Sequence, residues 1–274
     1  MNIKNFEYLR DQVKFSGFGE GLEKELKEKI EKQLPEFQLN HRAEFGKDVV
    51  TTRLDFNKSK NSDMYFFNQY VVSFKPENSK ELMNQTFYMG KWNNITLKEA
   101  YNMMNGRAVY KEFHKMDKDG EDPSKYYPTG QKYNAWVQMD FKNADQKGNF
   151  RMEKYHENYG FVLDFDVLLA KYPFKELQDE NSKQRLVESI QKGNRQAVTL
   201  VDNGEERKYY IEANPQYKTV NVYDSNMQQI QNRESRSQSQ AKENKEGEKN
   251  SLKADSDEPA KTEKKEKRIR QGIS

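Results

Sequence analysis

Few residue patterns in this chain could support catalysis or hold a cofactor, and each is incomplete. The glycine-rich segment 17–21 leads into a helix, as phosphate-binding loops do, but a helix rather than a strand precedes it and glutamates crowd the helix start. Around the acidic run 117–122, an EF-hand register puts Lys and Tyr where the first and last calcium ligands belong. The three histidines (His41, His114 and His156) lack the spacing of a zinc site. We therefore expect no catalytic residues, no cofactor and no metal, and the chain is not predicted to be an enzyme.

One block of sequence occurs twice and places an arginine at a similar point in each copy. Residues 96–110 and 186–199 each read as a short amphipathic helix, a glycine that ends it, an arginine and a strand beginning Ala-Val. Repeated supersecondary units are typical of scaffolds and binding surfaces. Chance similarity is the alternative, because glycine is common where helices end. Arg107 and Arg195 are expected to be exposed at the strand starts, with anion binding as the other interpretation.

A tryptophan stands on the polar face of a predicted strand. In the run 132–141, alternation puts Ala135, Val137 and Met139 on one face and Trp136 on the other, beside polar residues. An exposed Trp136 could stack on a base or anchor a partner. The alternative is that it lies buried under a neighbouring helix.

The C-terminal segment 232–274 differs from the rest of the chain. It contains no Phe, Tyr or Trp, so it is expected to be disordered. It carries 12 of the 47 basic and 9 of the 44 acidic residues, which leaves the other 231 residues neutral. Its last basic residues could contact phosphates without sequence preference, or serve only to keep the chain in solution. These candidates are Lys264, Lys265, Lys267, Arg268 and Arg270.

The elements that must position these residues alternate between helical and strand patterns. Short helices are expected near 5–16, 22–34, 164–171 and 181–192, with another helix in the first copy of the repeat. Strands follow each helical region, and Phe66, Tyr70, Val72 and Phe74 are expected to share one buried face. Residues 115–131 read as an insertion loop between two strands.

The fold class predicted from this pattern is α+β, with two or three helix-then-antiparallel-meander units and a disordered C-terminal tail. The boundaries are 1–92 for the N-terminal helices and meander, 93–160 for the first helix–Gly–Arg–meander unit, 161–231 for linker helices and the second such unit, and 232–274 for the tail. The oligomeric state stays open.

The cellular location of the protein is predicted from features that the sequence lacks. It has no cysteine, no apolar run of 18 residues and no apolar leader near Met1, so we expect a cytoplasmic protein that does not enter a membrane.

Several stretches together resemble a domain family of unknown function that is carried on bacterial conjugative transposons and related mobile elements. They are 63–68, 95–101, 105–109, 133–138, 192–196 and 211–224, and the last is the most specific. The resemblance covers about residues 1–230. It implies a cytoplasmic accessory protein of a mobile element, with DNA or DNA-handling proteins nearby.

Two functional hypotheses follow. The first is a non-enzymatic binding module of a mobile element whose sheet surfaces contact a protein, such as a DNA-processing enzyme. It predicts an exposed apolar or aromatic patch on a sheet face or edge. The alternative is a nucleic-acid-binding protein that uses exposed strand aromatics and the basic tail, and it requires Trp136 to lie exposed with Arg107 or Arg195.

Overall fold

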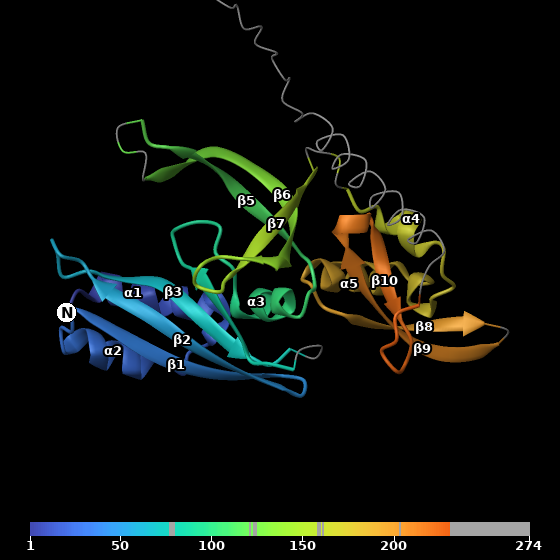
Figure 1. Ribbon diagram of the computed structural model, residues 1–274, viewed down its shortest axis with the longest axis horizontal. Coiled ribbons are helices and arrows are strands. Elements are labelled where there is room, and N and C mark those ends of the chain that lie inside the picture. Colours follow the sequence, from blue (N-terminus) through green and yellow to red (C-terminus); the bar gives the residue numbers. More distant parts are fainter. Residues whose placement is uncertain are drawn as a thin grey trace, which may run out of the picture. The chain divides into compact units, whose positions relative to one another are not determined.

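The computed structural model describes residues 1–76, 80–120, 122, 125–157, 160, 162–202 and 204–230. In this part of the chain, helices alternate with strands that form three antiparallel sheets, which confirms the predicted α+β class (Figure 1). The predicted disordered tail lies outside the described residues. The helical elements are α1 (Ile3–Val13), η1 (Lys14–Phe18), α2 (Glu23–Glu31), α3 (Leu97–Met104), α4 (Phe165–Leu169), η3 (Lys175–Leu177), α5 (Glu180–Gln191) and η4 (Pro215–Tyr217). The strands are β1 (Glu36–Phe45), β2 (Asp48–Lys58), β3 (Tyr65–Phe74), β4 (Met83–Tyr88), β5 (Val109–Lys118), β6 (Tyr126–Ala144), β7 (Phe150–His156), β8 (Gln196–Asp202), β9 (Glu205–Asn214) and β10 (Thr219–Tyr223).

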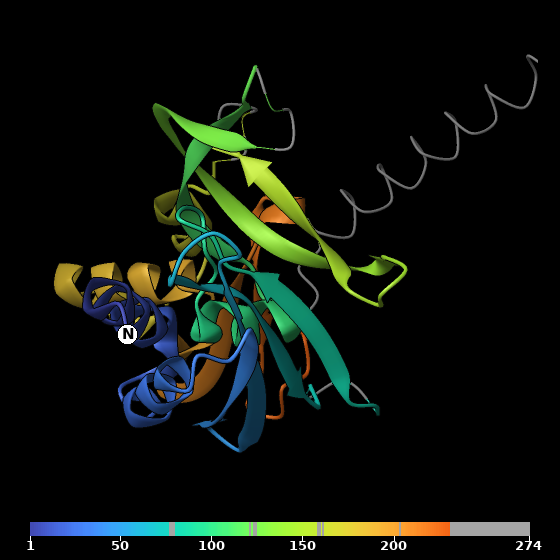
Figure 2. The same ribbon diagram turned by 90° about the vertical axis from the view of Figure 1, so that its left-hand side faces the viewer.

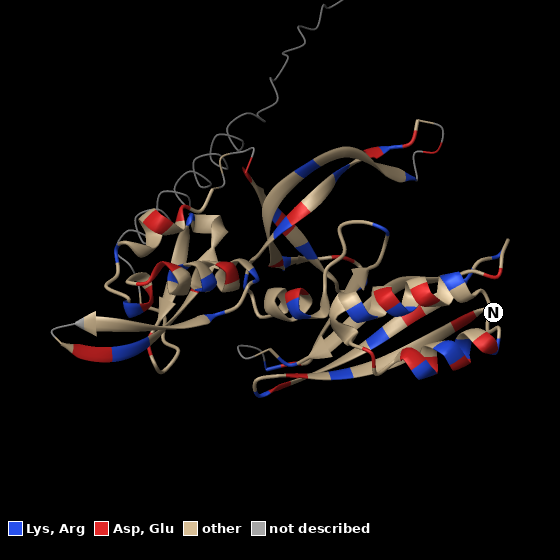
Figure 3. Cartoon of the chain, turned by 180° about the vertical axis from the view of Figure 1, so that it is seen from behind, with Lys and Arg blue, Asp and Glu red and all other residues tan. Residues whose placement is uncertain are grey.

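The first sheet, with strand order β1-β2-β3-β4, has helices on one face only. Helices α1 and α2 lie behind this sheet in Figure 1 and in front of it in Figure 3, where their solvent-facing sides carry both Lys or Arg and Asp or Glu. Apolar residues at alternate positions, such as Leu39, Leu54 and Val72, point to the helices and are fully buried. No helix in the described part of the chain covers the opposite face (Figure 1 and Figure 3), which we call the open face.

A β-bulge changes the alternation in β3 and corrects one prediction. Pairing with β2 runs Asp55↔Gln69 and then Phe56↔Phe67, so Asn68 is the extra residue. Because one residue is inserted, the inward positions shift: Phe67 is buried, whereas Phe66 is half exposed on the open face. The prediction that Phe66 shares the buried face of Tyr70 was therefore wrong, although Tyr70, Val72 and Phe74 are buried as expected.

The second sheet, β5-β6-β7, contributes to two hydrophobic cores, one on each face. Its long twisted strands are the green to yellow-green ribbons of Figure 2. One face, with Val109, Phe113 and Val137, joins the core formed by the first sheet and helices α1, α2 and α3. The other face, with Trp136, joins the core built from α4, α5 and the third sheet, whose strand order is β10-β9-β8. Residues 1–230 accordingly form one compact unit in which the helix-then-meander segments share cores.

The hairpin of β5 and β6 is longer than the sequence indicated. Its ladder continues through Met116↔Pro128 and Lys118↔Tyr126 after an irregularity past His114. Much of the predicted loop 115–131 is therefore strand. The tyrosines at the start of β6 favour extended backbone, and pairing resumes once the irregularity has shifted the register.

Side-chain carboxamides join the sheets at their edges. The amide of Asn93 binds both the N–H and the C=O of His114 on β5, at 2.7 and 3.0 Å. The amide of Gln85 on β4 binds both main-chain groups of Phe150 on β7, at 2.8 and 3.2 Å. Each carboxamide thus replaces a peptide group of a neighbouring strand and satisfies strand groups that would otherwise lack a partner.

Candidate functional site

Arg107, the arginine of the first repeat copy, lies in a closed junction between the two copies. It is only 8% exposed, so the prediction of an exposed residue was wrong. Its guanidinium donates to the C=O of Gly193 (3.0 Å) and to Oδ1 of Asn102 (2.9 Å), and it lies 5.2 Å from the Tyr101 ring centroid. Burial lowers the pKa of Arg107. The physical reason for its burial is that the glycine turn of the second copy packs directly against it.

Arg195, the matching residue of the second copy, is also mostly buried. It forms an ion pair with Glu212 (Nε to Oε2, 2.9 Å) and lies over the Tyr223 ring. Tyr223 donates its hydroxyl to the same carboxylate (2.6 Å), and burial followed by Glu212 raises the pKa of Tyr223. Arg195 is therefore engaged inside the protein, contrary to the expectation of exposure.

Trp136 is 2% exposed and belongs to the second core, where its ring lies 6.1 Å from that of Phe165 in α4. The prediction that Trp136 lies on the strand face opposite Val137 is confirmed. Of the two interpretations of that face, the buried one is correct. The face is covered because the α4, α5 and third-sheet segment packs on it. The prediction of a nucleic-acid surface built from Trp136 and the two arginines was therefore wrong.

The other candidates from the sequence are scattered or lie outside the described residues. The tail residues Lys264, Lys265, Lys267, Arg268 and Arg270 fall outside them. The three histidines lie on β1, β5 and β7, each against an aromatic ring. Within the described ranges, no three His, Asp or Glu groups gather as metal ligands.

The structure instead exposes an aromatic groove at one end of the first sheet. Phe66 on β3 is 50% exposed, Tyr88 on β4 is 64% exposed and Tyr8 on α1 is 54% exposed. They line a hollow of about 780 Å³ between α1, the start of β3 and the end of β4. Met64 and Met89 also line it, and Lys91 is the charged residue at its rim. We call this hollow, defined by Tyr8, Met64, Phe66, Tyr88, Met89 and Lys91, the aromatic groove.

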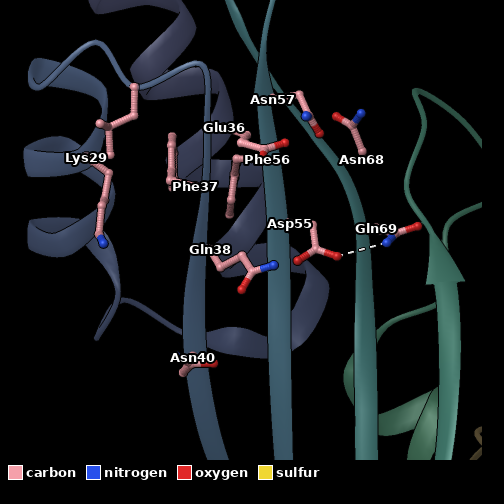
Figure 4. Close-up of a pocket in the computed structure, with 11 residues that line it drawn as sticks. Lys29, Glu36, Phe37, Gln38, Asn40, Asp55, Phe56, Asn57, Asn68 and Gln69 are labelled. Atoms are coloured by element: carbon pink, nitrogen blue, oxygen red, sulfur yellow. Dashed lines mark hydrogen bonds between the residues drawn. The ribbon is translucent and has the colours of Figure 1, made fainter.

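A row of polar side chains continues across the open face from the aromatic groove (Figure 4). A second hollow of about 810 Å³ is lined by amide side chains of β1, β2 and β3, together with Asp55 and with Lys29 of α2 at its margin. Gln69 donates to Asp55 Oδ2 (2.8 Å), and Arg53 also pairs with this carboxylate, at 3.0 Å. We call this surface the amide row; its members are Gln38, Asn40, Asn57, Asn68 and Gln69.

The β-bulge connects the two hollows. Asn68 and Gln69 stand next to each other on the open face, and both line the aromatic groove and the hollow of the amide row. The result is one continuous surface that offers aromatic rings at one end and amide donors and acceptors at the other. Such groups bind a ligand by contact and hydrogen bonds, and they include no nucleophile paired with a base.

Sequence reasoning missed this surface because its aromatic residues sit in ordinary strand and helix patterns. Phe66 looked like a core residue, and only the bulge turns it outward. A usable signal was present in the run Tyr65-Phe66-Phe67, since three consecutive aromatic residues on one strand cannot all face the core.

No protein-family model, no curated protein and no solved structure matches this chain. None of the helices that the structure describes is long and apolar enough to cross a membrane.

Proposed function

We propose that this protein is a non-enzymatic accessory protein that binds a protein partner through the open face of its first sheet. The observation that carries the proposal is the aromatic groove, where Tyr8, Phe66 and Tyr88 are each half exposed or more. Exposed aromatic residues that share a concave site commonly mark protein contacts, and Tyr is enriched among residues that dominate binding energy.

The shape of the surface indicates how a partner would bind. An apolar or aromatic side chain of the partner enters the aromatic groove, and the adjoining polar segment of the partner hydrogen-bonds to the amide row. This arrangement of an apolar centre beside a polar rim is that of typical protein interfaces. The charged residues that line the two hollows balance in number, and this favours a partner segment of low net charge; they are Lys29, Lys91, Glu36 and Asp55.

The biological setting in this proposal rests on sequence resemblance alone. The resemblance implies a cytoplasmic accessory factor of a mobile element, and a DNA-processing enzyme is the kind of partner that this setting suggests.

The proposal can be tested by selecting peptides from a random display library on the full-length protein. We expect enriched peptides with an apolar or aromatic anchor. Their binding by isothermal titration should weaken at least tenfold in F66A/Y88A, because the removed rings supply hot-spot contacts worth roughly 2 kcal/mol. V167A is the matched control, since Val167 is exposed on α4. If no peptide binds, or if F66A/Y88A binds as well as the wild type, the groove is not the site.

A second function is favoured by one specific feature: Phe66 and Tyr88 stand on the open sheet face beside amide side chains. Proteins that bind single strands stack bases on aromatic rings of a sheet and read base edges with polar groups. The test is fluorescence anisotropy with labelled single-stranded DNA across a salt series. Binding that is lost in F66A/Y88A supports this function.

The same assay separates the groove from the basic tail. A full-length variant with Lys264, Lys265, Lys267, Arg268 and Arg270 changed to Gln removes five of the tail's 12 basic charges and leaves the groove unchanged. Binding that disappears in this variant, and that salt weakens steeply, assigns DNA contact to the tail.

A further inference from the structure

One edge of the first sheet has main-chain groups without partners. Along β1, the bond from Lys58 N–H to Pro35 C=O (2.8 Å) fixes which residues face β2: the odd-numbered ones. The even-numbered residues therefore direct their N–H and C=O groups away from the sheet. None of these groups has a hydrogen-bond partner among the described residues. The residues are Glu36, Gln38, Asn40, Arg42 and Glu44, and all five are exposed.

Other edges in the described part of the chain are at least partly covered. The carboxamides of Asn93 and Gln85 cover His114 of β5 and the start of β7, as described above. On β8, the N–H of Thr199 donates to the Glu176 carboxylate (2.9 Å). On β10, Ile230 N–H donates to Val222 C=O (2.8 Å), so the chain after β10 turns back over its edge. Within the described ranges, no side chain or turn hydrogen-bonds to the outer edge of β1, and an open edge is a template for pairing with another strand.

The side chains along the β1 edge of one copy complement those of a second copy of the same edge. Glu36 and Arg42 lie three residues on either side of Leu39, and Gln38 and Asn40 lie one residue on either side. In an antiparallel pair of two β1 strands with a two-fold axis at Leu39, Arg42 of each copy stands opposite Glu36 of the other, and Gln38 stands opposite Asn40. Opposite charges placed across strands stabilise a pair, and like charges destabilise it.

We propose that two copies of this chain associate through antiparallel pairing of their β1 strands in this register. The neighbouring register, centred on Asn40, is disfavoured because it places Glu36 opposite Glu44. The register centred on Leu39 is the one that places Glu36 and Arg42 opposite each other, and charge pattern restricts pairing at edge strands in this way. Arg42 and Glu44 of one copy are already 3.4 Å apart, but both are well exposed, so Arg42 is free to exchange one carboxylate for the other at little cost.

This pairing has a structural consequence. The two-fold axis is perpendicular to the sheet, so the two first sheets form one eight-stranded sheet with both open faces on the same side. Each aromatic groove then lies at an outer end, beside β4. A partner with two binding segments would gain affinity from the linked sites.

Sedimentation equilibrium of the full-length protein across a concentration series tests the proposal. We expect a reversible monomer–dimer equilibrium. E36R and R42E should each weaken association roughly tenfold, because two attractive pairs become repulsive. The charge swap E36R/R42E should restore it. E180R is the matched control: it makes the same charge change at a well-exposed position of α5, a helix that packs in the second core.

Two further results test whether β1 forms the dimer interface and whether the pairing is centred on Leu39. N40P removes an outward N–H at an exposed edge position where proline is tolerated, and it should abolish the dimer. A wild-type protein that stays monomeric at all concentrations, or a dimer unaffected by N40P, overturns the proposal. Failure of the charge swap to restore association overturns the register. F66A/Y88A should dimerise normally, because both changed rings lie on β3 and β4 and neither lies on β1.

Discussion

The junction between the repeat copies and the open face of the first sheet hold similar residue types in opposite environments. At the junction, Arg107 and Arg195 are enclosed by acceptors and aromatic rings, and Trp136 on the adjoining face of β6 is buried in the second core. On the open face, Phe66 and Tyr88 are half exposed or more beside unburied amides. Residue type alone therefore does not distinguish a buried position from an exposed one. What covers each strand face decides whether an aromatic residue stabilises the core or is available to a partner.

The two glycine turns sharpen this comparison because they are alike locally. Gly106 and Gly193 both end a helix with positive φ, at 80° and 79°. A Cβ on Gly193 would lie 2.8 Å from Val109 Cγ2 and 3.0 Å from the C=O of Ala108, whereas a Cβ on Gly106 would meet only Phe141, at 3.8 Å. The first repeat copy thus packs against the turn of the second, and a shared sequence motif acquires two different roles.

The largest expected effect is a loss of stability at the buried Trp136. W136A should lower the free energy of unfolding by about 3–5 kcal/mol, because it leaves a cavity in the second core. Urea denaturation followed by circular dichroism measures the loss. A change below about 1 kcal/mol would mean that the face of β6 carrying Trp136 is not packed as described.

G193A should cost about 2–4 kcal/mol, from a left-handed backbone and from a clash with Ala108 and Val109. G106A is the matched control and should cost about 1–2 kcal/mol, since only the backbone term applies. Urea midpoints of the two variants give the difference directly. Equal losses would contradict the close contact between the two copies.

F66A/Y88A should change the free energy of unfolding much less than W136A, by about 1 kcal/mol or less, because both rings are already largely in water. The same variant should weaken peptide binding at least tenfold. Thermal unfolding and the titration described above, run on one preparation, check both parts. A large loss of stability would show that these rings serve the core instead of a partner.

The smallest expected effect concerns His41, whose ring packs edge-on against Phe18 at 5.5 Å. Burial lowers the pKa of His41 in the folded protein. The unfolded chain then takes up a proton more readily, so His41 supports stability above its ordinary pKa of about 6.5 and loses that support as the pH falls below it. On going from neutral to mildly acidic pH, the urea midpoint should fall more for the wild type than for H41Q. Parallel losses would show that His41 does not contribute to the pH dependence.

Local patterns in the sequence determined the order of helices and strands, the glycine stops of the two repeat helices and the outward alternation of Trp136 relative to Val137. These follow from helix capping and from the two-residue period of strands, which depend on neighbours along the chain. Only the tertiary structure decided that a second unit covers Trp136, that the arginines of the two copies meet acceptors inside the protein, and that a bulge at Asn68 turns Phe66 outward. Those outcomes depend on which surfaces pack together and on one unpaired residue in a ladder, and both are set by segments that are distant along the chain.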